Sequence, residues 1–183
     1  MKAAAPTTDT LVARCVAGEE PAWRELHRHH HASVYGFLRR MGVRPPDTED
    51  AAQEVFVQVF RYLATFEHRA DLRTWLYKLC LSQAARVRRR AAMGWALRWL
   101  WRQTAEDAAP SPGWSESETQ RRMQSALDRM KAIHRSVFVL FELEGLSGEQ
   151  VAVATGLRHA TVRRRLHNAR QEFEMLIRDE VPR

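Results

Sequence analysis

The stretch that decides the fold runs from Gly145 to Phe173 and reads "GLSGEQVAVATGLRHATVRRRLHNARQEF". Ser147 precedes an apolar segment and is followed three residues later by Gln150, a spacing that predicts a capping box at the start of a short helix. Gly156 can adopt the left-handed conformation that ends a helix, so a tight corner is predicted there. A second helix is then predicted to begin near His159.

The second helix is predicted to have a buried side and a basic side. Apolar residues recur at intervals of four, three and four, which places them on one stripe: Val162, Leu166, Ala169 and Phe173. Two helices joined by a glycine-containing turn, the second with a basic outer face, are typical of a helix-turn-helix, whose second helix enters the major groove of DNA. Arginine suits this role because its planar fork bonds guanine O6 and N7 together. The alternative is a surface helix whose arginines are merely solvated.

Composition agrees with a polyanionic partner. The chain has 183 residues, a net charge of +7 and a pI of about 10.2, which favours nucleic acid or an anionic membrane surface. Cys15 and Cys80 are too far apart for a CxxC metal site, so buried, reduced thiols are expected. No apolar run approaches the roughly 20 residues that span a bilayer, and no signal-peptide core is evident. A cytoplasmic protein without membrane insertion is therefore expected.

The spacing of apolar residues predicts helices throughout, so an all-α protein is expected. The helices predicted in the first half cover residues 10–17, 20–41, 48–66 and 72–90. In "RPPDTED" the two prolines are predicted to break the chain before Asp47 or Thr48 caps the third helix. The stretch from Pro110 to Gly113 indicates a linker, and a final helical block is predicted from about Ser117 to near the end.

The third and fourth predicted helices carry a second motif. "DTEDAAQEVF", from Asp47 to Phe56, is followed by a short polar loop and then by "LRTWLYKLCLSQAARVRRR". This segment resembles region 2 of bacterial RNA polymerase sigma factors of the extracytoplasmic-function group, and "VFVLFELEGLSGEQVAVATGLRHATVRRRLHNAR" resembles their region 4. The resemblance covers roughly residues 8–90 and 118–178 in the order typical of the family.

The resemblance implies two small helical domains joined by a flexible linker: region 2 at residues 8–92, a linker at 93–117 and the region 4 helix-turn-helix at 118–180. It implies an alternative sigma factor that binds core RNA polymerase and directs promoter-specific transcription initiation. The implied partners are the β′ clamp helices and β flap of core polymerase, promoter DNA and an anti-sigma factor. No catalytic motif is found, so a non-enzymatic protein without cofactor or bound metal is expected.

The resemblance also implies three sets of contact residues. Core polymerase would be bound by Asp50, Gln53, Glu54 and Gln58. The minus-ten element would be melted and read by His68, Arg69, Asp71, Arg73, Lys78, Ser82 and Arg86. The minus-thirty-five element would be contacted by His159, Ala160, Thr161, Arg163, Arg164, Arg165, His167 and Arg170, the arginine triplet dividing between groove (Arg163, Arg164) and phosphate (Arg165). Many family members carry Arg-Asn at Leu81 and Ser82 and an acid at Arg86, so unusual minus-ten recognition is predicted.

Two other functions compete with the sigma factor. A stand-alone helix-turn-helix regulator would not need the acidic face of the third helix, and a non-DNA module would use the basic helix on another anion or on a membrane. His27 and His31 share a helix face, but a structural role is favoured over a metal site because no third ligand is near in sequence. The segment with Trp95, Trp99 and Trp101 is expected to extend the helix or contact a partner rather than to bind membrane.

Overall fold

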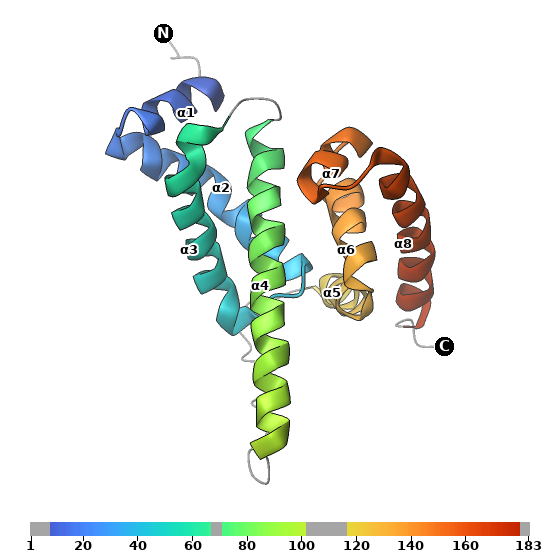
Figure 1. Ribbon diagram of the computed structural model, residues 1–183. Helices are drawn as coiled ribbons and strands as arrows, with labels where there is room; N and C mark the ends of the chain where they lie inside the picture. Colours follow the sequence, from blue (N-terminus) through green and yellow to red (C-terminus); the bar gives the residue numbers. More distant parts are fainter. Residues whose placement is uncertain (1–7, 67–70, 102–116, 180–183) are drawn as a thin grey trace.

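The computed structural model describes residues 8–66, 71–101 and 117–179, and within these ranges all regular structure is helical. The prediction of an all-α protein is therefore confirmed. Two groups of helices lie side by side, with α4 at the boundary between them (Figure 1). The first group contains α1 (Thr8–Val16), α2 (Glu20–Arg40), α3 (Pro45–Tyr62), a 3-10 turn (Leu63–Thr65) and α4 (Leu72–Trp101). The second contains α5 (Glu118–Arg129), α6 (Ala132–Phe138), a π-helical turn (Val139–Leu143), α7 (Gly148–Thr155) and α8 (His159–Asp179).

The start of α3 differs from the prediction. The two prolines do not break the chain but occupy the first positions of the helix, with Arg44 in an extended conformation as its N-cap. Proline suits this place because the first helical N–H groups have no intrahelical acceptor and its φ is already helical. Thr48, predicted as a possible cap, is buried one turn later, and its hydroxyl donates to the Arg44 carbonyl at 2.7 Å.

Helix α4 extends into the segment that carries Trp95, Trp99 and Trp101, which is one of the two roles expected for that segment. It continues past Arg90 to Trp101, because the chain offers no proline there and one glycine costs a helix only about 1 kcal/mol. Its most deeply buried side chains include Leu76, Tyr77 and Cys80, whereas Trp75 is half-buried and packs on Phe66 with ring centroids 5.6 Å apart. Trp75 is thus part of the packing.

The two groups of helices share one continuous apolar core. Leu76 and Cys80 of α4 belong to the same cluster as Leu146 and Val151, which begin the helix-turn-helix. Burial of these side chains removes apolar surface from water, which stabilises the packed state by about 25 cal/mol per Å² of buried surface. This free energy holds α4 against α7. None of the helices in the described ranges combines the length and the apolar character that a bilayer-spanning segment needs.

Both cysteines are buried, and neither forms a disulfide. Burial raises the pKa of Cys80 far above its usual value and also raises that of Cys15. Because the thiolate is the reactive form, we expect alkylation of the native protein at pH 8 to be at least about a hundredfold slower than alkylation of the urea-unfolded chain. Mass spectrometry after timed exposures to iodoacetamide measures the alkylation rate of each thiol. Equal rates in the two states would contradict the buried positions.

Candidate nucleic-acid interface

The predicted helix-turn-helix is present with its predicted capping chemistry. The Ser147 hydroxyl accepts from the Gln150 amide at 3.2 Å, while the Gln150 side-chain oxygen accepts from the Ser147 amide at 2.8 Å. Gly156 ends α7 with φ of 70°, and the Leu157 amide then donates to the Ala152 carbonyl at 3.2 Å. These bonds satisfy backbone groups that a helix end would leave unpaired, so the turn is fixed by its local sequence.

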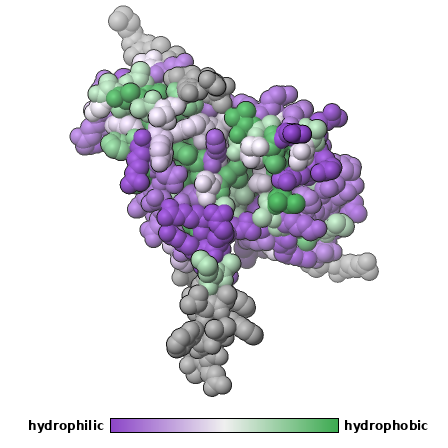
Figure 2. Space-filling view, viewed as in Figure 1, coloured by the Kyte–Doolittle hydropathy of each residue, from purple (hydrophilic) through white to green (hydrophobic). Residues whose placement is uncertain are grey.

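Helix α8 presents the basic side that the periodicity predicted. Val162, Leu166 and Ala169 are buried, and Phe173 packs on the core with its ring 4.5 Å from that of Phe138. The opposite side lies at the surface, where hydrophilic residues dominate the region over α8 (Figure 2). Of the predicted contacts, Thr161 and Arg165 are half-buried and the rest are exposed: His159, Ala160, Arg163, Arg164, His167 and Arg170.

Three of these exposed side chains have partners within their own domain: His167 with Gln171 at 3.3 Å, and His159 and Arg170 with carboxylates. The Nε2 atom of His159 lies 3.6 Å from a Glu149 carboxylate oxygen, above the first turn of α7. A Cβ at Gly148 would lie 2.6 Å from this nitrogen, so a residue without a side chain makes room for the imidazole. Hydrogen bonds from its own backbone amide and from the Ser147 hydroxyl lower the pKa of the Glu149 carboxyl. The nearby His159 lowers it further. Arg170 donates to Glu142 at 2.6 Å.

Arg163 and Arg164 differ from these three residues. Within the described part of the chain neither guanidinium forms an ion pair, and both are exposed on the first half of α8. A free, exposed guanidinium keeps all its donors available for an external acceptor. The structure therefore leaves the two residues predicted for the groove open to a ligand, while the roles of all the predicted contacts stay predictions.

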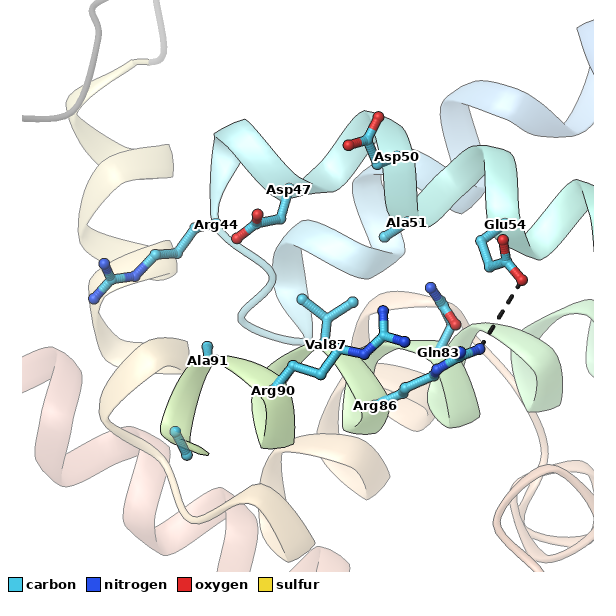
Figure 3. A pocket seen from close by; sticks show the side chains of 11 residues that line it. Arg44, Asp47, Asp50, Ala51, Glu54, Gln83, Arg86, Val87, Arg90 and Ala91 are labelled. Atoms are coloured by element: carbon cyan, nitrogen blue, oxygen red, sulfur yellow. Dashed lines mark ion pairs between the residues drawn. The ribbon is translucent and has the colours of Figure 1, made fainter. Parts of the chain in front are cut away.

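The predicted polymerase-docking residues lie along the outer side of α3. Asp50 and Gln53 are exposed, and Glu54 and Gln58 are half-buried. Asp50 and Glu54 also line a cavity of about 880 Å³ between α3 and α4. Figure 3 shows the acidic side chains projecting from α3 and those of Arg86 and Arg90 lying along α4, with Glu54 and Arg86 4.0 Å apart. The cavity thus joins the surface predicted for polymerase to one residue predicted for the minus-ten element.

Sequence reasoning did not identify several residues of this cavity: Arg44, Asp47, Gln83 and Arg90. Gln83 is buried, and its side-chain oxygen has no hydrogen-bond partner among the described residues. The available signal was its helical spacing from the apolar Leu76 and Leu79, because a polar residue on an apolar stripe must find a partner or face a cavity.

The residues predicted for the minus-ten element fall into three situations. Lys78, Ser82 and Arg86 are exposed on α4, and His68 and Arg69 lie outside the described residues. Asp71 caps α4 by accepting from the Thr74 amide at 2.6 Å, and its other oxygen accepts from Gln150 at 2.6 Å. Arg73 donates to the backbone carbonyl of Glu144. Asp71 and Arg73 therefore contact the helix-turn-helix half of the chain, which the sequence did not predict.

His27 and His31 belong to a cluster of aromatic rings between α2 and α3. The rings of His27 and His31 lie 5.0 Å apart, and His27 lies 4.4 Å from the ring of Phe56 on α3. His31 contacts Glu49 at 3.1 Å. Among the described residues no group of three or more potential metal ligands is found. The cluster thus joins α2 to α3.

Comparisons with known proteins match both halves of the chain. Sigma-70 region 2 matches residues 26–94, and Sigma-70 region 4 matches residues 120–173. The ECF RNA polymerase sigma factor SigE of Mycolicibacterium smegmatis is 32% identical over 84% of this chain, which spans 60% of that protein. The RNA polymerase sigma factor CarQ of Myxococcus xanthus is 28% identical over 87% of this chain and 91% of its own length.

Solved structures share the fold. CnrH, in complex with the cytosolic domain of CnrY, superposes with a TM-score of 0.70 over 93% of this chain and 97% of its own, at 23% identity. RpoE from Bartonella quintana, in complex with the anti-sigma factor NepR, gives a TM-score of 0.64 over 87% of this chain and 98% of its own, at 20% identity.

Proposed function

On the premise that this chain belongs to the extracytoplasmic-function group of RNA polymerase sigma factors, and so directs promoter-specific transcription initiation, we propose how its residues divide that work. The observation that carries the proposal is the presence of region 2 and region 4 on one chain, in that order. A stand-alone helix-turn-helix regulator is not favoured, because the region 2 match would then have no role. Residues 8–92 form the polymerase-binding and minus-ten domain, and residues 118–180 form the minus-thirty-five domain.

Helix α3 docks on the β′ clamp helices of core polymerase. Its outer side offers the carboxylates of Asp50 and Glu54 and the amides of Gln53 and Gln58. Carboxylates accept charge-assisted hydrogen bonds from arginine and lysine, whereas amides both donate and accept, so the face selects a basic, polar partner surface. Region 4 binds the β flap.

Region 4 reads the minus-thirty-five element through the N-terminal half of α8. Arg163 and Arg164 enter the groove beside the small Ala160, while Arg165, His167 and Arg170 contact phosphates. On region 2, Lys78, Ser82 and Arg86 of α4 contact the separated strands together with Arg73, Asp71 and the loop that carries His68 and Arg69. Bound single strands offset the free energy of unpairing the minus-ten element.

The remaining assignments follow from the same division of labour. The protein acts in the cytoplasm, where polymerase and promoter DNA are found, and it supplies specificity without chemical catalysis. An anti-sigma factor controls it. Two structures similar in fold, in which CnrH is bound to the cytosolic domain of CnrY and RpoE to the anti-sigma factor NepR, support this partner.

Reconstitution tests the proposal. Purified protein is added to sigma-free core polymerase, and transcription is scored across a genomic promoter pool. We expect co-purification with core and initiation at a limited set of promoters that share upstream and minus-ten elements. A protein that neither co-purifies nor initiates would overturn the assignment.

Arg164→Ala should weaken recognition of the upstream promoter element. Loss of a bidentate contact to guanine costs about 1–3 kcal/mol, so transcription from the preferred upstream element should fall about ten- to a hundredfold, with core binding intact. Arg178→Ala is the matched control, because it removes the same charge from the last turn of the same helix. Promoter-pool transcription and core pull-down measure both. An equal loss in the two variants, or a parallel loss of core binding, would refute the groove assignment of Arg164.

A further inference from the structure

Glu144 is a buried carboxylate at the boundary between the two halves of the chain. Only 7% of it is exposed, and it comes directly after the π-helical turn of Val139–Leu143. Its amide donates to the Val139 carbonyl at 2.9 Å, five residues back, and Gly145 then leaves the helix with φ of 67°. A π turn inserts one residue into a helix and rotates the residues after it, and such turns occur frequently at functional sites. Glu144 directly follows this turn, and its carboxylate meets side chains of α2 and α4.

Three side chains of the first half surround this carboxylate. Arg40 of α2 and the Tyr77 hydroxyl of α4 both donate to it. A terminal nitrogen of Arg73 lies 3.7 Å from it and also donates to the Glu144 carbonyl. Burial, and then the hydrogen bond to Glu144, raise the pKa of Tyr77 to about 12, so the phenol stays a donor at neutral pH.

Glu144 does not pair every buried donor of these three side chains. The Nε atom of Arg40 is buried and has no hydrogen-bond partner in the described part of the chain. An unpaired buried donor is costly, so the cluster is not saturated by Glu144. Two guanidiniums and a hydroxyl around one anion are also the donor set that binds a phosphodiester, which offers more acceptor oxygens than a carboxylate.

Further contacts across the same boundary keep the two halves together. Gln150 of α7 donates to Asp71 at 2.6 Å, and Gln124 of α5 donates to the Arg39 carbonyl at 2.9 Å. Both Asp71 and Arg73 belong to the set proposed for the minus-ten element, so region 4 contacts two residues of that surface.

This closed arrangement does not fit a promoter. The minus-ten and minus-thirty-five elements are, by their names, centred about 25 base pairs apart, which at about 3.4 Å per base pair is on the order of 85 Å. In the structure α7 packs against α4, and the two groups of helices lie side by side (Figure 1). Given the proposed function, the two domains must separate before both elements can be bound, and separation withdraws Glu144 from its three partners.

We propose that Arg40, Arg73 and Tyr77 form a backbone-phosphate site of region 2, which Glu144 fills as an internal anion while the chain is closed. Opening exposes the site, and a phosphate of the separated promoter strand takes the place of the carboxylate. Glu144 thereby competes with DNA, and the free protein is held in a state that binds promoter strands weakly.

The test compares Glu144→Gln with Glu174→Gln. Both variants remove one negative charge from region 4, but Glu174 lies on the exposed part of α8 and pairs only with the adjacent Arg178 in the described structure. The probe is a fluorescent single-stranded DNA of mixed sequence, because a phosphate contact does not depend on base identity. We expect Glu144→Gln to bind it about tenfold more tightly than the wild type, and Glu174→Gln to gain less than about twofold. Equal affinities of the two variants would overturn the proposal.

A second pair of measurements locates the site. Adding Arg40→Gln to Glu144→Gln should cancel the gain, and a gain that survives this change would also overturn the proposal. Inorganic phosphate alone is tested as a competitor, and full displacement of the DNA by it would assign the cluster to small anions instead. Thermal melting verifies that each variant is folded. Core pull-down is measured separately, so loss of polymerase binding would count against the proposed function and not against this site.

Discussion

Replacing Asp50 by lysine should abolish co-purification with core polymerase and, with it, transcription. Asp50 is exposed on the outer side of α3, and no ion pair involves it within the described structure, so its carboxylate is available to a partner. The change removes a charge-assisted acceptor and places a cation against a basic partner surface. Truncating such a pair costs about 2–5 kcal/mol and like-charge contact costs several more, so affinity for core should fall by at least about a hundredfold.

Glu49→Lys is the matched control for this change. It makes the same charge reversal at the neighbouring residue, but Glu49 points toward α2, where it contacts His31 at 3.1 Å. Core affinity is measured by competition with a labelled sigma factor, and melting curves verify the fold of both variants. We expect Glu49→Lys to bind core nearly as well as the wild type. If the two variants lose affinity equally, the effect is one of net charge, and α3 is not the docking helix.

Features that depend on neighbours along the chain are predictable from the sequence. The reciprocal bonds of Ser147 and Gln150 and the left-handed Gly156 require only residues within one turn, so the pattern predicts the helix-turn-helix together with its boundaries. The buried stripe of α8 is predictable from periodicity for the same reason. The two prolines before α3 show where local sequence does not decide. A proline can break a helix or occupy its first turn, and in this chain both prolines occupy the first turn.

Contacts between the two halves are not predictable in this way. Arg40 and Glu144 are separated by 104 positions, and nothing in the local sequence of either identifies the other. The π turn that directs Glu144 toward α4 is likewise absent from a pattern based on a 3.6-residue period. The sequence therefore predicts the candidate site as three separate sets of residues. That Asp71 and Arg73 meet region 4 depends on packing, which the sequence pattern of either domain does not contain.

Gly42 likewise depends on residues from the other half of the chain. Its position after α2 indicates a helix end, and its φ of 84° agrees with that role. The structure adds a second requirement from the other half of the chain. A Cβ at Gly42 would lie 2.1 Å from the Nη1 atom of Arg135, whose side chain is 3% exposed and donates to the Asp128 carbonyl at 2.5 Å. Gly42→Ala must therefore both strain the backbone and displace a buried guanidinium.

We expect Gly42→Ala to lower the free energy of unfolding by about 3 kcal/mol, because left-handed strain costs about 1–2 kcal/mol and the displaced charge adds to it. The melting temperature should fall by roughly 6–12 °C. Gly18→Ala separates the two terms: its φ of 85° is nearly the same, but no atom lies within 4 Å of the added Cβ. That variant should lose only the backbone term, about 1–2 kcal/mol. Equal losses in the two variants would mean that Arg135 adapts without cost, and that Gly42 serves only as a helix end.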